Sequence, residues 1–336
     1  MDYLPLGKLK IDHLKHLLDR YTSTDDRVVV GSGVGEDATV IDFGDTYLVA
    51  KTDPITFVAD NIGWYAIAVN ANDIATRGAT PKWFLATILL PESRTTETMV
   101  ETIFAQLADA CQRYDIALCG GHTEVTHGLE RPIVVGQMLG EVAKDRLITT
   151  AGAQVGDDIL LTKGIAIEAT AIIAQTRDAD LRKRYSADML DCCRNFIHSP
   201  GISVVDDALI ACRCGIVHAM HDPTEGGLAT GLHELAEAAG VGVRIQAEAV
   251  PIFPETRQFC RDYQLQPFGV IASGALVLTA SPNQTPHIIA GLKEHDIPAT
   301  VIGRIVPKQE GRLLIAGNGT QPLPIYEQDE ITKIFM

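Results

Sequence analysis

Hydrophobic residues recur along the chain at two spacings, one typical of amphipathic helices and one typical of strands. In the first half, this pattern predicts helices near 11–18, over 63–77 and over 95–114. It predicts strands over 38–41, 47–51, 84–89, 116–119 and 132–142. Gly44-Asp45 separates the first two strands, and Gly-Asp between apolar runs is typical of a hairpin turn.

The pattern restarts near residue 155 and again alternates between the two spacings. The expected strands lie over 159–162, 216–220, 243–246, 275–279 and 301–305. The expected helices lie over 168–175, 187–196, 204–212, 228–239 and 286–295. Alternating helices and strands predict an α/β (α+β) fold in two domains. The expected division is an N-terminal extension over 1–30, a first domain over 31–154, a second over 155–310 and a tail over 311–336.

Length and composition limit the class of protein. The 336 residues exceed what one ordinary domain needs, and no apolar run approaches the roughly 20 residues that span a bilayer. The start, Met1-Asp2-Tyr3-Leu4-Pro5, carries an acid and no apolar segment, so we expect no signal peptide and a cytoplasmic protein. The net charge of −15 argues against a nucleic-acid partner. A phosphate ligand therefore needs local positive charge or a divalent metal.

Seven cysteines are present, and none of them forms a CxxC pair. The Cys192-Cys193 and Cys212/Cys214 pairs are candidate zinc ligands, but each lacks the second paired element of a structural zinc site. Reduced thiols in a cytosolic protein are the better interpretation.

Two acids flank the predicted hairpin. If the chain turns at Gly44-Asp45, residues whose numbers sum to about 90 lie opposite each other, which pairs Asp37 with Asp53. Like charges placed opposite one another destabilise a sheet unless a positive charge lies between them. A divalent metal meets this need. Taken singly, Asp37 is also an ordinary loop acid, and Asp53 a turn residue before Pro54.

A third acid lies in the predicted helix over 63–77. Asn70, Asp73 and Arg77 form a polar stripe beside an apolar one. Asn and Asp are poor helix formers, and local rules broken without local gain often mark functional sites. The alternative is that Asp73 and Arg77 form a surface ion pair.

Three glycine-bearing segments are candidate phosphate-binding loops. Gly31–Gly35 precedes Asp37 and offers backbone N–H groups, including those of Gly33 and Gly35. Gly120–Glu124 follows a predicted strand, where loops often carry function. Asp222–Gly227 precedes a predicted helix, and helix N-termini bind anions. The alternatives are that Asp222 is an N-cap or turn acid and that His122 and His221 are structural.

Five short motifs occur in order, namely Gly35-Glu36-Asp37-Ala38, Thr52-Asp53-Pro54, Asn72-Asp73-Ile74, Gly120-Gly121-His122-Thr123 and Asp222-Pro223-Thr224-Glu225-Gly226-Gly227-Leu228. Together they resemble the superfamily of aminoimidazole ribonucleotide (AIR) synthetase, over about residues 30–310. That superfamily also contains HypE, selenophosphate synthetase and thiamine-monophosphate kinase. The resemblance implies a homodimer whose N-terminal mixed sheets pair into a shared barrel, with an α/β C-terminal domain on each side.

The resemblance also implies ATP between the two domains, Mg²⁺, and transfer of the γ-phosphoryl group to a small substrate. The metal ligands that it implies are Asp37, Asp53, Asp73 and Asp222. The catalytic residues are Asp53, Asp73 and His122. The nucleotide-binding residues are Gly33, Gly35, Asp37, Thr52, Asp53, Asn72, Gly120, Gly121, Thr123, Gly226 and Gly227. Glu124, Lys163 and Glu168 are secondary candidates for substrate or phosphate contacts.

Two departures from the family pattern narrow the function. Selenophosphate synthetases carry Cys or selenocysteine in the early glycine-rich segment, whereas the first cysteine here is Cys111. HypE carries a C-terminal cysteine that receives a carbamoyl group, whereas the last cysteine here is Cys260. Motifs such as Leu161-Thr162-Lys163-Gly164 look most similar to HypE-like proteins. We expect an ATP- and Mg-dependent phosphotransferase with an unidentified small substrate. The alternatives are a HypE-like assembly protein that binds maturation partners, and a nucleotide-independent scaffold.

Overall fold

The computed structural model describes residues 9, 11–23, 25–33, 35–56, 58–317 and 319–335. The Met1–Pro5 segment and Val34 of the first glycine segment lie outside this range. Two compact units divide the chain. The N-terminal unit comprises 25–31 and 37–147, and the C-terminal unit comprises the described parts of 1–23, 32–36 and 148–336. No helix among the described residues combines the length and apolar character that crossing a membrane requires.

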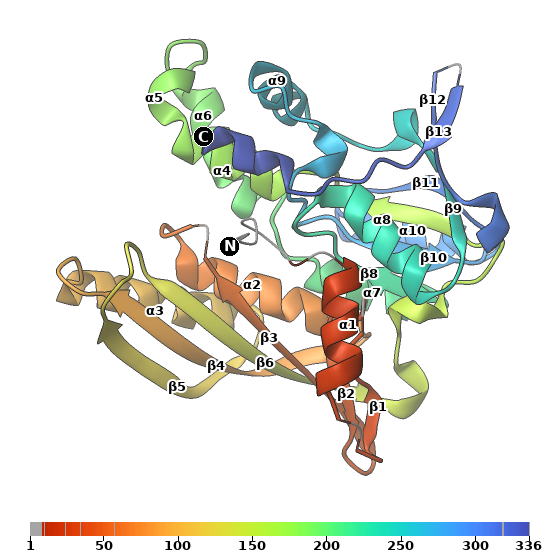
Figure 1. Cartoon of the computed structure of the whole chain (residues 1–336), viewed down its shortest axis with the longest axis horizontal. Helices are drawn as coiled ribbons and strands as arrows, with labels where there is room; N and C mark the ends of the chain where they lie inside the picture. The colour runs from red at the N-terminus through yellow and green to blue at the C-terminus, as the bar shows by residue number, and fades with distance from the viewer. Residues whose placement is uncertain are drawn as a thin grey trace. The chain divides into compact units, whose positions relative to one another are not determined.

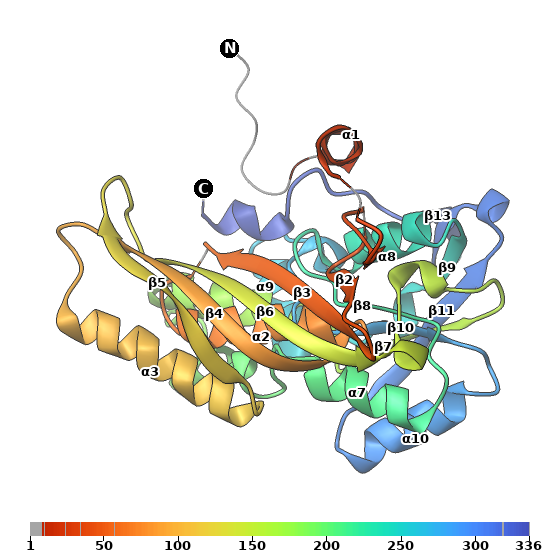
Figure 2. The ribbon, with the colours of Figure 1, turned by 90° about the horizontal axis from the view of Figure 1, so that it is seen from below.

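The N-terminal unit is built on a mixed six-stranded sheet with the order β1-β2-β3-β6-β4-β5. Its strands are β1 (Val28–Val30), β2 (Thr39–Asp42), β3 (Thr46–Ile55), β4 (Thr80–Pro91), β5 (Ala117–Thr126) and β6 (Ile133–Ala143). Among the strand pairs that the structure describes in this sheet, β4 and β5 alone are parallel. Helix α2 (Ile62–Ala75) packs on β3 and β6, and α3 (Glu97–Arg113) packs on α2 and β5 (Figure 1). Figure 2 shows β3, β6, β4 and β5 running side by side.

The predicted hairpin is present, but its register differs by one residue from the prediction. The backbone N–H of Phe43 donates to Thr46, and Asp42 Oδ1 accepts from Gly44, so the turn closes with Asp42 opposite Tyr47. The pairing of β2 with β3 ends at Thr39 and Ala50, so it does not reach Asp37 and Asp53. On its other side, β3 places Asp53 opposite Gly136 of β6. Asp37 and Asp53 therefore do not meet by pairing across the hairpin, and their contacts with nearby cations are described below.

The sequence predicted a loop at Gly120–Glu124. In the structure this segment is the middle of strand β5. Glycine is needed at 121 for close packing, because a Cβ there would collide with the carbonyl oxygen of Ala86 on β4. Strand β5 is the edge of the sheet and is solvent-exposed along nearly its whole length, with Val125 58% exposed. Gly121 thus permits the backbones of β4 and β5 to approach, whereas a Cβ at Gly120 would meet no neighbour.

The C-terminal unit contains a seven-stranded sheet with the order β13-β12-β9-β11-β7-β10-β8. Its strands are β7 (Asp158–Thr162), β8 (Ala219–His221), β9 (Gly242–Gln246), β10 (Val277–Ala280), β11 (Ala299–Val306), β12 (Arg312–Ala316) and β13 (Gly319–Pro322). Residues 311–336, set apart as a tail in the sequence, supply two of these strands. Neighbouring strands are antiparallel except β9 and β12.

Helices of the C-terminal unit pack around this sheet and around each other. They are α1 (Ile11–Tyr21), α4 (Ile167–Thr176), α5 (Asp178–Leu181), α6 (Ala187–Arg194), α7 (Val205–Cys214), α8 (Gly227–Ala238), α9 (Pro254–Asp262) and α10 (Thr285–Glu294). Short 3-10 helices lie at Lys144–Arg146 in the N-terminal unit and at Thr150–Gly152, Asn195–Ile197, Ala247–Ala249, Pro267–Gly269, Lys308–Glu310 and Glu330–Ile334. The apolar side of α8, including Leu228, Leu232 and Leu235, belongs to the main core.

Candidate functional site

Three carboxylates and two cations gather in the N-terminal unit, and we call this group the acid cluster: Asp37, Asp53, Asp73, Lys51 and Arg77. Lys51 Nζ lies 3.0 Å from Asp73 Oδ2 and 3.6 Å from Asp53 Oδ2. Arg77 Nη2 lies 3.5 Å from Asp37 Oδ2. The acids thus converge as the sequence predicted, and two side chains of the same unit neutralise part of their charge.

Strand β3 and helix α2 position the acid cluster. Lys51 and Asp53 are two residues apart on β3, so they point to the same face of the sheet, which is the face that α2 covers. Asn70 Nδ2 donates to the backbone oxygens of Asp53 and Ala66, which ties the helix to the strand. Asp73, also on α2, is buried, so the interpretation of a surface pair between Asp73 and Arg77 is wrong.

Burial and neighbouring charges perturb the acid cluster. Burial raises the pKa of Asp73, and the charges of Asp37 and Asp53 act in the same direction, while Lys51 opposes them. Burial acts to lower the pKa of Lys51, but the three carboxylates outweigh it and hold the pKa above its ordinary value. Lys51 is therefore a permanent cation. None of the sequence motifs includes Lys51, although its position two residues before Asp53 on a strand was a usable signal.

The donor atoms of the acid cluster suit a hard cation. Mg²⁺ prefers oxygen ligands, and the cluster offers three carboxylates. Asn70 Oδ1, beside them on α2, is buried and accepts no hydrogen bond among the described residues. A buried oxygen without a donor is costly, and a cation or a bound water relieves that cost.

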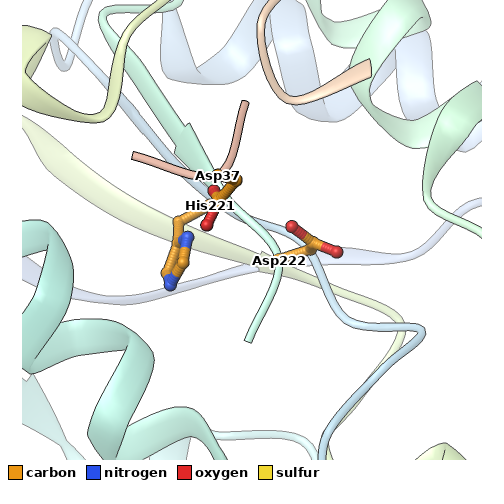
Figure 3. A group of neighbouring side chains, drawn as sticks. All are labelled: Asp37, His221 and Asp222. Atoms are coloured by element: carbon orange, nitrogen blue, oxygen red, sulfur yellow. The ribbon is translucent and has the colours of Figure 1, made fainter. Parts of the chain in front are cut away.

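A second group of polar residues lies in the C-terminal unit, where β8 leads into α8. His221 ends β8, and its Nε2 lies 2.9 Å from Glu234 Oε2 on α8. Asp222 follows, and both residues are buried. Figure 3 draws these two side chains, together with Asp37 of the N-terminal unit. The contact with Glu234 ties the His221 ring to α8, which is the structural role given above as the alternative for this histidine.

The Gly226-Gly227 turn begins α8 in left-handed backbone conformation, with φ of 79° and 67°. A Cβ at Gly227 would lie 2.6 Å from the carbonyl oxygens of Phe268 and Val270, so the position favours glycine. The Gly226 N–H, a predicted phosphate donor, donates to Asp329 Oδ2 at 2.7 Å. Burial raises the pKa of Asp329 to about 6. An anionic partner from the same chain thus already meets this amide.

The remaining predicted residues are distributed over both units. His122 Nε2 lies 3.2 Å from Glu124 Oε2 on exposed β5, and the sheet order puts two strands between β5 and β3. Strands are spaced by about 4.8 Å, so Gly120, Gly121, His122 and Thr123 lie on the order of 14 Å from the acid cluster in one chain. Thr52 points to the opposite face of β3, and its Oγ1 donates to the Gly136 oxygen.

Two further predicted positions, Gly33 and Gly35, belong to the C-terminal unit. A Cβ at Gly35 would lie 2.8 Å from the Glu234 oxygen, so this glycine packs closely against α8. Gly33 lines a small cavity of about 170 Å³ with Ser32 and residues of α1 and α8. Asn72 is buried in α2.

The secondary candidates Lys163 and Glu168 are both buried in the C-terminal unit. Burial raises the pKa of Glu168 to about 7, and the charges of Asp329 and Glu225 add to this, while a hydrogen bond with Ser273 opposes it. Glu168 Oε2 accepts no hydrogen bond among the described residues. Glu168 is thus a buried acid that titrates near neutral pH.

Replacing Lys51 with Gln is expected to destabilise the protein by about 3 kcal/mol, because Asp73 is left as a buried charge without its partner. The double variant Lys51→Gln/Asp73→Asn should recover most of this loss. Urea unfolding measures both, with Lys82→Gln on β4 as a matched loss of charge. Equal stability of Lys51→Gln and Lys82→Gln would contradict the assigned role.

Replacing Glu168 with Gln is expected to stabilise the protein at alkaline pH. A carboxyl whose pKa rises on folding binds protons more tightly in the folded state, so wild-type stability falls as pH rises from about 4.5 to about 7. The full difference is on the order of 3 kcal/mol. Unfolding of both proteins between pH 5.5 and 8.5 should show the gap widening with pH. A constant gap would refute the buried titration.

Comparison with known proteins matches the chain to one family along most of its length. Residues 35–142 match the N-terminal domain of AIR synthase related proteins, and residues 154–316 match the C-terminal domain. A putative hydrogenase expression/formation protein of Methanocaldococcus jannaschii is 26% identical, covering 88% of this chain and 89% of its own. The carbamoyl dehydratase HypE of Escherichia coli is 27% identical, covering 80% of this chain and 76% of its own.

Solved structures agree with this match. A HypE–HypF complex has a TM-score of 0.76 at 18% identity, covering 94% of this chain and 99% of its own. A structure of the hydrogenase maturation protein HypE in complex with ATP has a TM-score of 0.69 at 21% identity, covering 96% and 97%. At such identities the structures show the shared two-domain fold with mixed sheets. The chain belongs to the family of AIR synthase related proteins.

Proposed function

We propose that the protein binds ATP with Mg²⁺ and transfers the γ-phosphoryl group to an oxygen of a small substrate. The observation that carries the proposal is the convergence of three carboxylates on two cations: Asp53 and Asp73 lie beside Lys51, and Asp37 lies beside Arg77. Membership of the AIR synthase related proteins supports it, as does the structure of a HypE with ATP. A protein with a net charge of −15 binds a triphosphate most readily through a metal.

Phosphoryl transfer needs positioning and charge neutralisation more than a protein nucleophile. The proposed metal ligands are Asp37, Asp53, Asp73 and Asp222, and a magnesium ion there supplies neutralisation of phosphate charge. Lys51 holds the Asp53 and Asp73 carboxylates in place and adds a permanent positive charge. Asn70 fixes the backbone of Asp53 through its amide. The proposed nucleotide contacts include Gly33, Gly35, Thr52, Asn72, Gly226 and Gly227.

A homodimer is part of the same proposal. Strand β5 leaves one edge of the N-terminal sheet open, and unpaired edges are templates for pairing with another chain. The face of the sheet opposite α2 is also apolar, with half-buried leucines and valines alternating with buried residues on β4 and β6. Through such pairing, Gly120, Gly121, His122 and Thr123 would serve the nucleotide site of a second copy, with His122 in a catalytic role.

A second candidate function is that of an ATP-binding assembly protein. The hydrogenase expression/formation protein and the HypE–HypF complex favour it, because both names describe maturation proteins. Turnover separates the two functions. ATP hydrolysis that a substrate stimulates and Asp73→Asn abolishes supports the enzyme, whereas tight ATP binding without turnover supports the assembly protein.

Replacing Asp37, Asp73 or Asp222 singly with Asn is expected to weaken Mg-ATP binding by roughly tenfold or more, because each change removes a proposed metal ligand. Calorimetric titration with a non-hydrolysable ATP analogue and Mg²⁺ measures the affinity. Asp109→Asn, an exposed acid on α3, is the matched control. Unchanged affinity in all three variants would remove the metal assignment.

Replacing Val125 with Lys is expected to dissociate the dimer into monomers, because a charge on an edge strand opposes strand pairing. Light scattering after size-exclusion chromatography measures the mass. Ile325→Lys, 78% exposed in the C-terminal unit, is the control and should leave the mass unchanged. A monomeric wild-type protein, or a Val125→Lys variant that stays dimeric, would exclude this interface.

A further inference from the structure

A cavity of about 310 Å³ lies in the C-terminal unit, and Lys163 is the one residue of its lining that the sequence motifs include. Its wall exposes polar and apolar surface in similar amounts, and the apolar part comes from the segment 249–254, which includes Ile252 and Phe253. Its charged lining residues are Lys163, Glu248 and Arg257. Pockets for small organic ligands typically start near 300 Å³ and combine apolar walls with a few polar groups. The size and lining therefore fit one small molecule.

Lys163 is the buried polar group of this cavity. Its side chain is 7% exposed, and Nζ donates to the Ser203 oxygen at 2.6 Å and to Asp207 Oδ2 at 3.2 Å. An ammonium group has three N–H donors, so one remains for a ligand. Asp207 already balances the charge of Lys163. Lys163 can therefore donate a hydrogen bond to a ligand, but its positive charge is already balanced by Asp207.

The uncompensated charge comes from Arg257. It lies on α9, and its guanidinium makes no ion pair or hydrogen bond with the residues that the structure describes. Glu248, on another side of the cavity, accepts from the Gly317 N–H at 2.6 Å. A guanidinium presents paired donors that match a carboxylate or a phosphate. The free cation selects an anionic group.

The backbone at the cavity is held in an uncommon conformation. Lys163 has φ of 54°, and Ala166, three residues later, has φ of 61°. Residues other than glycine adopt the left-handed region at a cost, and such positions cluster at functional sites. The Lys163 N–H donates to Pro298 at 2.7 Å, and a Cβ at Gly164 would lie 2.9 Å from the Phe253 ring. These contacts fix Lys163 where it lines the cavity.

We propose that this cavity binds a small organic anion, with its apolar body against Ile252 and Phe253 and its carboxylate or phosphate on Arg257 and Lys163. The site is separate from the acid cluster, and its existence does not depend on ATP binding. Carboxylates and phosphates share the recognition chemistry, so probes of both kinds distinguish them.

The test is titration of the full-length protein with benzoate and phenyl phosphate, followed by ligand-observed NMR. Benzylamine and benzyl alcohol are probes of the same size with a positive charge or none. We expect the anions to bind with dissociation constants on the order of 1 mM, and Arg257→Gln to weaken binding about tenfold. Arg257→Lys should retain part of the affinity, because it keeps the charge but loses the paired donors.

Arg261→Gln is the matched control, since Arg261 lies on the same helix, is exposed and is absent from the cavity lining. Its affinity should equal that of the wild type. Three results would each overturn the proposal: equal binding of benzylamine or benzyl alcohol, equal affinity of Arg257→Gln and Arg261→Gln, or no binding of either anion at millimolar concentration. The tighter of the two anions identifies the class of ligand.

Discussion

Burial of the Asp73 carboxylate on helix α2 is the constraint on which the candidate site depends. An isolated carboxylate in the protein interior is costly, and the cost falls when a cation lies beside it. Lys51 and Arg77 meet this need, one from β3 and one just after α2. Three carboxylates still face two cations, so the cluster keeps a negative balance that attracts a further cation. The packing of α2 on the sheet therefore brings Asp73 to Lys51 and at the same time assembles the proposed cation site.

In the C-terminal unit, backbone N–H groups at the start of a helix need a hydrogen-bond acceptor. The Gly226-Gly227 turn exposes N–H groups at the start of α8, and the carboxylate of Asp329 occupies the first of them. A nucleotide phosphate at this turn has to add to that arrangement or replace it. Asp329 and Glu225 lie close enough to Glu168 that their charges add to the effect of burial in raising its pKa, so negative charge accumulates around the turn. Cations and proton donors are therefore the ligands that this part of the unit favours.

Local sequence signals predicted the elements that local interactions determine. The β2–β3 hairpin, α2 with its polar stripe, and α8 after the glycine turn all follow from spacing and turn residues. The hairpin register failed by one residue, because the hydrogen bonds of Asp42 and Phe43 decide where the turn closes. The prediction of a loop at Gly120–Glu124 was wrong, since Gly121 serves the packing of β5 against β4.

Non-local pairing explains what the sequence did not show. Strands β12 and β13 join their sheet through β9, which lies far earlier in the chain. A short-range sequence pattern does not indicate such a distant partner. The spacing of Lys51 and Asp53 places both on one face of β3, but the ion pair of Lys51 with Asp73 depends on the packing of α2 against that strand. The positions of Asp37, Asp53 and Asp73 were recognised as a set because shared charge has to be compensated wherever the chain folds.

The hydrogen bond from Gly226 to Asp329 joins residues 103 positions apart. Domains generally fold as units, and earlier ones fold first while the ribosome is still adding residues. The N-terminal unit is nearly continuous and is complete once residue 147 has emerged. The glycine turn, by contrast, stays open until Asp329 has been synthesised. The C-terminal unit is therefore completed late in synthesis. Before that point, the nascent chain contains every residue of the N-terminal unit but lacks the last segment of the C-terminal unit.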